Sequence, residues 1–137
     1  MLSGLVRSTV QAVPHSRILA ACQAGPAPAP RISGTEVSFD DDGEIYLGMM
    51  PGSMKALDLL RDPRLALHCP TEDAPEGNSD AWIGDAKIAG LGVEVPAEGH
   101  HRFRIEVAEV VVTTVAGDRL VLRSWHPGRG VETRQRS

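Results

Sequence analysis

The chain of 137 residues has few cysteines, few lysines, few aromatic residues and no long hydrophobic run. Two cysteines, Cys22 and Cys69, are too few for a disulfide scaffold and favour a reducing compartment. We therefore expect a cytoplasmic protein whose cysteines are reduced, buried and unreactive. No apolar stretch approaches the roughly 18 residues that cross a bilayer, so no membrane partner is expected. The net charge of −4 argues against a nucleic-acid partner held by bulk positive charge.

The basic residues are unevenly divided, because twelve are arginine and only two are lysine. This bias indicates a GC-rich genome, and it makes Lys55 and Lys87 worth individual attention. The apolar share of 42% and the charged share of 23% are ordinary for a soluble globular protein. The length is typical of one domain, which we expect to span residues 1–137.

Residues 19–22 (Leu-Ala-Ala-Cys) match the lipobox of a bacterial lipoprotein signal. A signal peptide requires an apolar stretch of about 7–15 residues before its cleavage site. Residues 14–17 (Pro-His-Ser-Arg) occupy that place, so we interpret residues 18–22 as a short buried strand instead.

Metal ligands are not expected at the acidic or histidine-containing motifs. Residues 40–43 (Asp-Asp-Asp-Gly) lack the later glycine and glutamate of a calcium-binding loop and predict a hairpin turn with Gly43 at positive φ. Residues 68–69 (His-Cys) and 100–101 (His-His) are neighbours, and neighbours on a strand point to opposite faces. Neither pair can therefore chelate zinc from one face.

Apolar periodicity predicts a succession of short strands and one clear helix, at residues 53–62, with Ser53 as its N-cap. The strands are expected at residues 18–22, 32–39, 44–50, 64–69, 84–95, 101–115, 120–125 and 131–134. Residues 1–16 are interpreted as a weak N-terminal helix or arm and residues 130–137 as a C-terminal tail. Strands in hairpin succession around a single helix indicate a mainly β fold with a minor α component, arranged as a small antiparallel barrel.

The strongest local signal for a ligand lies where strand 44–50 meets the helix. Residues 50–55 (Met-Pro-Gly-Ser-Met-Lys) combine a glycine turn, a hydroxyl N-cap and a lysine in the first helical turn. Free backbone N–H groups and the helix dipole favour an anion here, whereas the cation of Lys55 is unfavourable unless an anion offsets it. The alternative is a capped helix with a solvated lysine, and the residues alone leave both interpretations open.

Two further groups of charges have plain structural interpretations. Asp85 and Lys87 alternate within one strand and share a face, which is typical of a surface ion pair across strands. Arg129, Arg134 and Arg136 give a basic C-terminus, either a solvated tail or side chains that reach a phosphate or carboxylate.

Three adjoining stretches resemble the pyridoxamine 5′-phosphate oxidase-like family: residues 30–37 (Pro-Arg-Ile-Ser-Gly-Thr-Glu-Val), 46–53 (Tyr-Leu-Gly-Met-Met-Pro-Gly-Ser) and 55–64. The similarity continues through residues 84–90 (Gly-Asp-Ala-Lys-Ile-Ala-Gly) and 125–130 (Trp-His-Pro-Gly-Arg-Gly). Members of this family are split β-barrels that bind a flavin or a deazaflavin, so the resemblance implies that fold.

The same resemblance implies a homodimer with one cofactor, FMN or alternatively coenzyme F-420, in each cleft between subunits. We expect Trp82 or Trp125 to be buried at that interface. By position in the family pattern, the residues implied to bind the cofactor are Arg31, Ile32, Ser33, Gly34, Thr35, Glu36, Gly48, Met49, Ser53, Lys55, Asp85, Lys87, Trp125 and Arg134. No catalytic residue is assigned.

The sequence departs from the family pattern at three places. Met54 replaces the arginine of the Ser-Arg-Lys phosphate motif, which removes one cation. The Arg-x-His pair with which the vitamin-forming oxidase holds its substrate phosphate is missing from residues 129–131 and 134–136. The connection 95–101 is short where many relatives carry a helix. The substrate of that oxidase is therefore not expected here.

The resemblance implies an oxidoreductase that transfers hydride between a bound FMN or F-420 and a small organic substrate. The cofactor carries the hydride in such enzymes, which agrees with the lack of an obvious acid–base motif. Two alternatives stay open, because a fold does not fix a function. One is a non-catalytic flavin- or haem-binding dimeric barrel, and the other is a vestigial family member without cofactor.

Overall fold

The computed structural model describes residues 18–24, 30–70 and 72–137. The predicted N-terminal helix or arm lies outside these residues. In chain order the elements are β1 (Ile18–Ala24), β2 (Pro30–Phe39), β3 (Ile45–Met49), α2 (Met54–Arg61), β4 (Arg64–His68), η1 (Ser79–Ala81), β5 (Asp85–Val95), β6 (His101–Ala116), β7 (Arg119–His126) and β8 (Gly130–Arg136).

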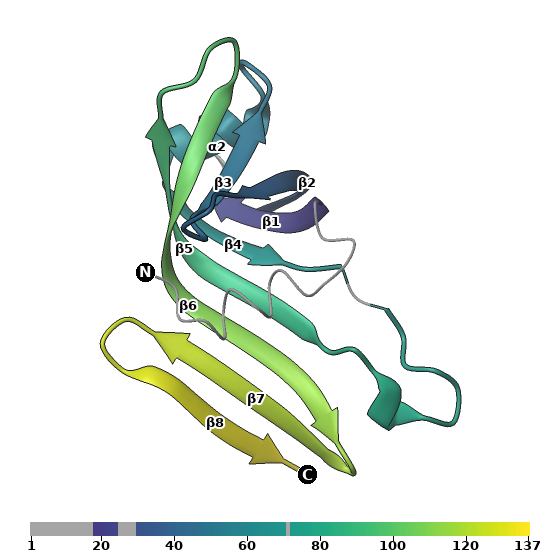
Figure 1. The fold of residues 1–137 in the computed structure, drawn as a ribbon. Helices are drawn as coiled ribbons and strands as arrows, with labels where there is room; N and C mark the ends of the chain where they lie inside the picture. Colours follow the sequence, from purple (N-terminus) through teal and green to yellow (C-terminus); the bar gives the residue numbers. More distant parts are fainter. Residues whose placement is uncertain (1–17, 25–29, 71) are drawn as a thin grey trace.

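The strands form one antiparallel sheet that closes on itself (Figure 1). The order is β3-β2-β1-β4-β5-β6-β7-β8, and β3 also pairs with β6, which closes the first six strands into a barrel. Figure 1 shows β7 and β8 as a pair that extends the sheet away from the barrel. β6 serves both parts, because residues 101–104 pair with β3 and residues 110–116 pair with β7. The predicted mainly β barrel with a single α-helix is confirmed for the described residues.

The C-terminal strand is longer than its sequence pattern predicts. β8 covers residues 130–136, most of the segment interpreted as a tail, and pairs with β7 from Gly130 opposite His126 to Arg136 opposite Leu120. Its residues are almost all exposed, because β8 is the outer strand of the extension. A strand that is solvated on both faces has no apolar alternation, and its charged side chains are typical of a protected edge.

Alternate side chains of the barrel strands fill the core. Leu47 on β3, Leu67 on β4 and Phe103 on β6 are each at most 2% exposed. The helix α2 adds Ala56 and Leu59, which are also buried. The core therefore joins the helix to strands on different sides of the barrel and holds the helix against them.

The ends of α2 agree with the predicted N-cap and with the predicted bounds of the helix. The hydroxyl of Ser53 accepts a hydrogen bond from the backbone N–H of Ala56 at 3.4 Å, as an N-cap does. At the other end the backbone N–H of Asp62 donates to the carbonyl of Asp58 at 2.9 Å, and Pro63 follows. Proline disfavours helical conformation in the residue before it, so the helix ends here.

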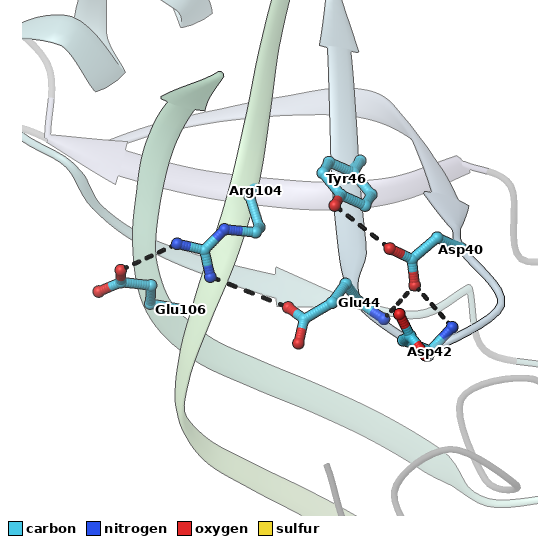
Figure 2. A network of polar contacts seen from close by, with 6 residues as sticks. All are labelled: Asp40, Asp42, Glu44, Tyr46, Arg104 and Glu106. Carbon is cyan, nitrogen blue, oxygen red and sulfur yellow. Dashed lines mark hydrogen bonds and ion pairs between the residues drawn. The ribbon is translucent and has the colours of Figure 1, made fainter. Parts of the chain in front are cut away.

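The hairpin between β2 and β3 is ordered by its own acidic residues (Figure 2). One carboxylate oxygen of Asp40 accepts hydrogen bonds from the backbone N–H groups of Asp42 at 3.0 Å and Glu44 at 2.9 Å. Gly43 adopts a φ of +82°, as predicted for this turn. The acidic run therefore acts as a turn in which a carboxylate binds the backbone.

Aromatic and charged side chains join β3 to β6 where the barrel closes. The guanidinium carbon of Arg102 lies 3.9 Å from the ring centre of Tyr46, a cation–π contact across the two strands. Arg104 lies 3.9 Å from a carboxylate oxygen of Glu44. Figure 2 shows the two side chains pointing toward each other. The hydroxyl of Tyr46 donates to Asp40, and burial together with this carboxylate raises the pKa of Tyr46.

A bulge in β5 gives a first prediction. The register of β5 against β6 shifts between Ala89 and Gly90, and a Cβ added at Gly90 would lie 2.1 Å from the carbonyl oxygen of Glu106. This neighbour is backbone, so the strands must separate to accept a side chain. We expect Gly90→Ala to lower the free energy of unfolding by about 1–3 kcal/mol, measured by urea denaturation. Gly48→Ala is the matched control, because a Cβ there meets no atom within 4 Å.

Candidate functional site

Strand alternation divides the predicted cofactor-binding residues between two faces of the sheet. On β2, Thr35 is 2% exposed and faces the core, whereas Gly34 and Glu36 face outward. The outward residues from the prediction are Ile32, Gly34, Glu36, Gly48, Asp85 and Lys87. A ligand lying on the barrel exterior can reach this group, but not the residues that alternate with it.

Four residues on four neighbouring strands lie in register, one opposite the next, and end at Lys87. Gly34 on β2 pairs with Ala20 on β1, Ala20 pairs with His68 on β4, and His68 pairs with Lys87 on β5. We call these four residues the lysine row. Neighbouring strands lie about 4.8 Å apart, so the three spacings between these four strands add up to about 14 Å, measured across the strands. It crosses the outer face of the barrel.

Lys55 reaches one end of the lysine row from the first turn of α2. Its ammonium group donates a hydrogen bond to the carbonyl oxygen of Gly34 at 2.9 Å. Lys55 is thus held against β2 by a contact that is exposed to solvent. The hydroxyl of Ser53 lies in the turn just before it, at the N-terminus of α2. An ammonium, a hydroxyl and a helix N-terminus together are donors suited to a phosphate.

The other end of the row carries an imidazole and a carboxylate in contact. His68 Nε2 lies 3.6 Å from a carboxylate oxygen of Asp85. His68 Nδ1 lies 2.7 Å from the carbonyl oxygen of Cys69, to which it donates, because a carbonyl only accepts. The partner of Asp85 across the strands is thus His68 on β4, which the sequence pattern did not predict. Lys87, two residues further along β5, is exposed.

Arg31, a predicted cofactor contact, forms part of an ion cluster around the buried carboxylate of Asp58. Its Nε donates to Asp58 on α2 at 2.6 Å, and Arg61 donates to the other oxygen of Asp58 at 2.7 Å. The Asp58 side chain is 0% exposed. Burial raises the pKa of Asp58, but the hydrogen bonds from Arg61 and Arg31 outweigh it, so the pKa lies below its usual value. This cluster holds α2 on β2.

Four other predicted residues face inward or contact the core. Met49 is 3% exposed within the core, and Trp125 packs against the core. The hydroxyls of Ser33 and Thr35 are buried without a hydrogen-bond partner among the described residues. Met49, Ser33 and Thr35 face the inside of the barrel wall, Trp125 packs against the core from β7, and none of the four joins the outward group.

Arg134 lies apart from the lysine row. It pairs with Leu122, which pairs with Thr113, which pairs with Asp85, so three strand spacings separate Arg134 from Asp85. Its guanidinium lies 3.8 Å from Glu132 on the same strand. The structure thus places this predicted contact at the outer edge of the sheet extension.

A second histidine–carboxylate contact lies between β6 and β7. His126 Nε2 is 2.9 Å from a carboxylate oxygen of Glu109. Glu109 lies 17 residues before His126 in the chain, so residue spacing in the sequence could not predict this contact. His126 Nδ1 is buried without a partner in the described part of the chain, so it is not accessible to a ligand.

Cys69 agrees with the expected buried thiol. It is 8% exposed and free, and its sulfur accepts a hydrogen bond from the backbone N–H of Ala86 at 3.0 Å. Burial raises the pKa of the thiol, which disfavours the reactive thiolate. The side chain of Cys22 lies outside the described residues.

An open cavity adjoins the Asp85 end of the lysine row. Its volume is about 400 Å³, within the usual range for small-molecule sites. Trp82 forms part of its wall, and the indole N–H of this residue donates to the carbonyl of Glu72 at 2.8 Å. The lining residues are Glu72, Asp73, Ala74, Ser79, Trp82, Asp85 and Val115.

Two further properties concern the described residues alone. Among residues 18–24, 30–70 and 72–137, no three His, Cys, Asp or Glu side chains gather as metal ligands would. No helix in that part of the chain has the length and apolar composition to cross a membrane.

No protein-family model matches the sequence, and no match is found among curated proteins. Solved structures do match. A pyridoxamine 5′-phosphate oxidase-related, FMN-binding protein from Nostoc punctiforme PCC 73102 aligns over 98% of this chain and 96% of its own, with a TM-score of 0.69 and 9% identity. PhzG from Burkholderia lata 383, in complex with tetrahydrophenazine-1-carboxylic acid, aligns over 97% and 88%, with a TM-score of 0.68 and 13% identity.

A haem-binding protein from Mycobacterium smegmatis also matches, over 98% of this chain and 88% of its own, with a TM-score of 0.62 and 9% identity. At such identities the likeness concerns the fold. The chain has the split β-barrel fold of the pyridoxamine 5′-phosphate oxidase-like proteins, as its sequence motifs imply.

Proposed function

We propose that the protein is a cytoplasmic, homodimeric oxidoreductase that binds FMN, or alternatively coenzyme F-420, on the outer face of its barrel along the lysine row. The observation that carries the proposal is that the two lysines of the chain stand at the two ends of this row, Lys55 through its bond to Gly34 and Lys87 through its register with His68. The fold is one in which solved proteins bind FMN.

The Lys55 end fits the phosphate of either cofactor. Lys55 supplies a positive charge, Ser53 a hydroxyl, and α2 the positive end of its dipole. Met54 stands where the family pattern has a second cation, so this end holds the phosphate with less charge. The carboxylate of Glu36 also faces outward on β2 and suits hydroxyl donors of the ribityl chain.

The rest of the row suits a flat ring. Gly34 presents no side chain at the start of the row. Gly48, on β3 outside the row, leaves the outer face beside β2 open, because a Cβ there would meet no atom within 4 Å. Lys87 is exposed at the far end and supplies a cation for the oxygen-rich edge of the ring. When bound, the cofactor would accept or release a hydride, and the chain would orient it and position the substrate beside it.

The cavity next to Asp85 is the place for the substrate in this proposal. It adjoins the Lys87 end of the row, because Asp85 belongs both to its lining and to the same face of β5. A second subunit would cover the outer face, since split-barrel proteins of this kind are implied to hold the cofactor between subunits. Light scattering at micromolar concentration tests the dimer.

The test of the proposal is a titration of cofactor-free protein with FMN and, separately, with F-420, followed by calorimetry and by the absorbance of the bound cofactor. We expect saturable binding of one of them with a dissociation constant in the micromolar range or below. Haemin is titrated in parallel, because a haem-binding protein shares the fold. Binding of haemin alone would support the non-catalytic alternative, and binding of none of the three would refute a cofactor function.

A further inference from the structure

We propose that His68 is the acid–base residue of the proposed cofactor site and that its Nε2 carries the proton that accompanies each hydride. This inference rests on the proposed function. His68 belongs to the lysine row, where the cofactor ring would lie, and it contacts Asp85, which lines the adjoining cavity. It therefore stands between the two places.

The hydrogen bonds of His68 assign different tasks to its two ring nitrogens. Nδ1 lies 2.7 Å from the carbonyl oxygen of Cys69 and must carry a hydrogen to bond with it. In the neutral imidazole the single hydrogen is then on Nδ1, and Nε2 has a lone pair. When a second proton arrives it binds at Nε2, so proton exchange takes place at this one atom.

The surroundings of Nε2 suit a group that exchanges a proton. A carboxylate oxygen of Asp85 lies 3.6 Å from it. The His68 side chain is 45% exposed, so solvent can restore the proton after each reaction.

The proton and electron balance is complete for an acceptor with a conjugated carbonyl group, such as a quinone. The cofactor, when bound in its reduced form, would supply a hydride with its electron pair, and His68 Nε2 would give a proton to the oxygen of the quinone. The quinone would leave as a hydroquinone, and His68 would be neutral with its hydrogen on Nδ1. In this proposal the acceptor would occupy the cavity of about 400 Å³ that has Trp82 in its wall.

The first arm of the test uses the cofactor-free protein. Long-range proton–nitrogen NMR of the histidine rings, assigned with His68→Gln, reports which nitrogen carries the hydrogen in the neutral form. We expect Nδ1 for His68. A neutral ring with its hydrogen on Nε2 would overturn the inference, because Nε2 would then have no lone pair to receive a proton.

The second arm uses protein loaded with the reduced cofactor, with menadione as the acceptor. A positioned acid typically accelerates a reaction by about 100-fold or more, so we expect His68→Gln to lower kcat by that factor and to leave the dissociation constant of the cofactor within twofold. Asp85→Asn should lower kcat less. His100→Gln is the matched control, because His100 Nδ1 also bonds a backbone carbonyl, that of Glu98, but lies on the β5–β6 turn.

The outcomes separate this inference from the proposed function. Cofactor binding with an unchanged kcat in His68→Gln overturns the role of His68 and leaves the cofactor site standing. Absence of binding by both cofactors refutes the proposed function, and the role of His68 falls with it. A loss of kcat in His100→Gln equal to that in His68→Gln also contradicts the proposal.

Discussion

Replacing Arg31 and Arg61 together by methionine should lower the free energy of unfolding by about 3–5 kcal/mol. The reason is the carboxylate of Asp58, which is 0% exposed and accepts one hydrogen bond from each arginine, at 2.6 and 2.7 Å. Without both partners, an ionised group would remain buried and uncompensated. Urea denaturation at pH 7 measures the loss.

A third substitution serves as the control for this result. Adding Asp58→Asn to the double variant removes the buried charge, so most of the lost stability should return. A loss smaller than about 1 kcal/mol in the double variant would contradict the prediction, since it would place the pair among ordinary surface ion pairs.

The pH dependence of the same variants provides a second measurement. In the wild type the pKa of Asp58 lies below its usual value, because the hydrogen bonds from Arg61 and Arg31 outweigh burial. Its stabilising contribution is therefore present above the unfolded pKa, near 3.8, and is lost as the pH falls through the lower folded value. In the double variant burial acts alone and raises the pKa. That variant should therefore gain stability relative to its own value at pH 7 as the pH is lowered.

The fold could be predicted from the sequence because its signals are local. The helix follows from Ser53 as a cap and Pro63 as a stop, and the β2–β3 turn follows from Gly43. The extent of β8 could not be predicted, because an edge strand solvated on both faces carries no apolar period.

The predicted site is assigned by motif similarity to a region of the sheet, without a distinction between its two faces. The motif similarity assigned residues 31–36 to the cofactor as one continuous run. Strand geometry sends alternate members to opposite faces, so Thr35 lies in the core while Gly34 and Glu36 face outward. The period of two in a β-strand is a property of the backbone, so it divides this run into two sets whatever ligand lies beside it.

The contacts of His68 with Asp85 and of Arg31 with Asp58 could not be read from the sequence. Each joins elements that are separated by a loop or by another strand in the chain, and each depends on the register between them. The register between strands is set when the sheet closes and the core packs. A local sequence pattern does not predict it. These contacts change the interpretation most, because they assign Arg31 to the fold and introduce His68 into the proposed site.

The second large effect is expected at the phosphate end of the proposed cofactor site. Lys55→Ala should weaken binding of the cofactor by about tenfold to a hundredfold. A charge-assisted hydrogen bond contributes about 1.5–3 kcal/mol, which corresponds to that range. The substitution also removes the bond to the carbonyl of Gly34, but this contact is exposed, so the cofactor-free protein should lose less than about 1 kcal/mol. Cofactor titrations and thermal melts of the free protein measure the two effects separately.

Two further variants decide whether the charge of Lys55 acts locally. Arg119→Ala removes one positive charge from β7, far along the sheet from α2, and should leave the affinity within twofold. Met54→Arg restores the second cation of the phosphate motif and should tighten binding, more strongly at low salt, because exposed charges are screened by ions. If Lys55→Ala binds the cofactor as tightly as the wild type, no anion is held at the start of α2, and Lys55 serves only to fasten the helix to Gly34.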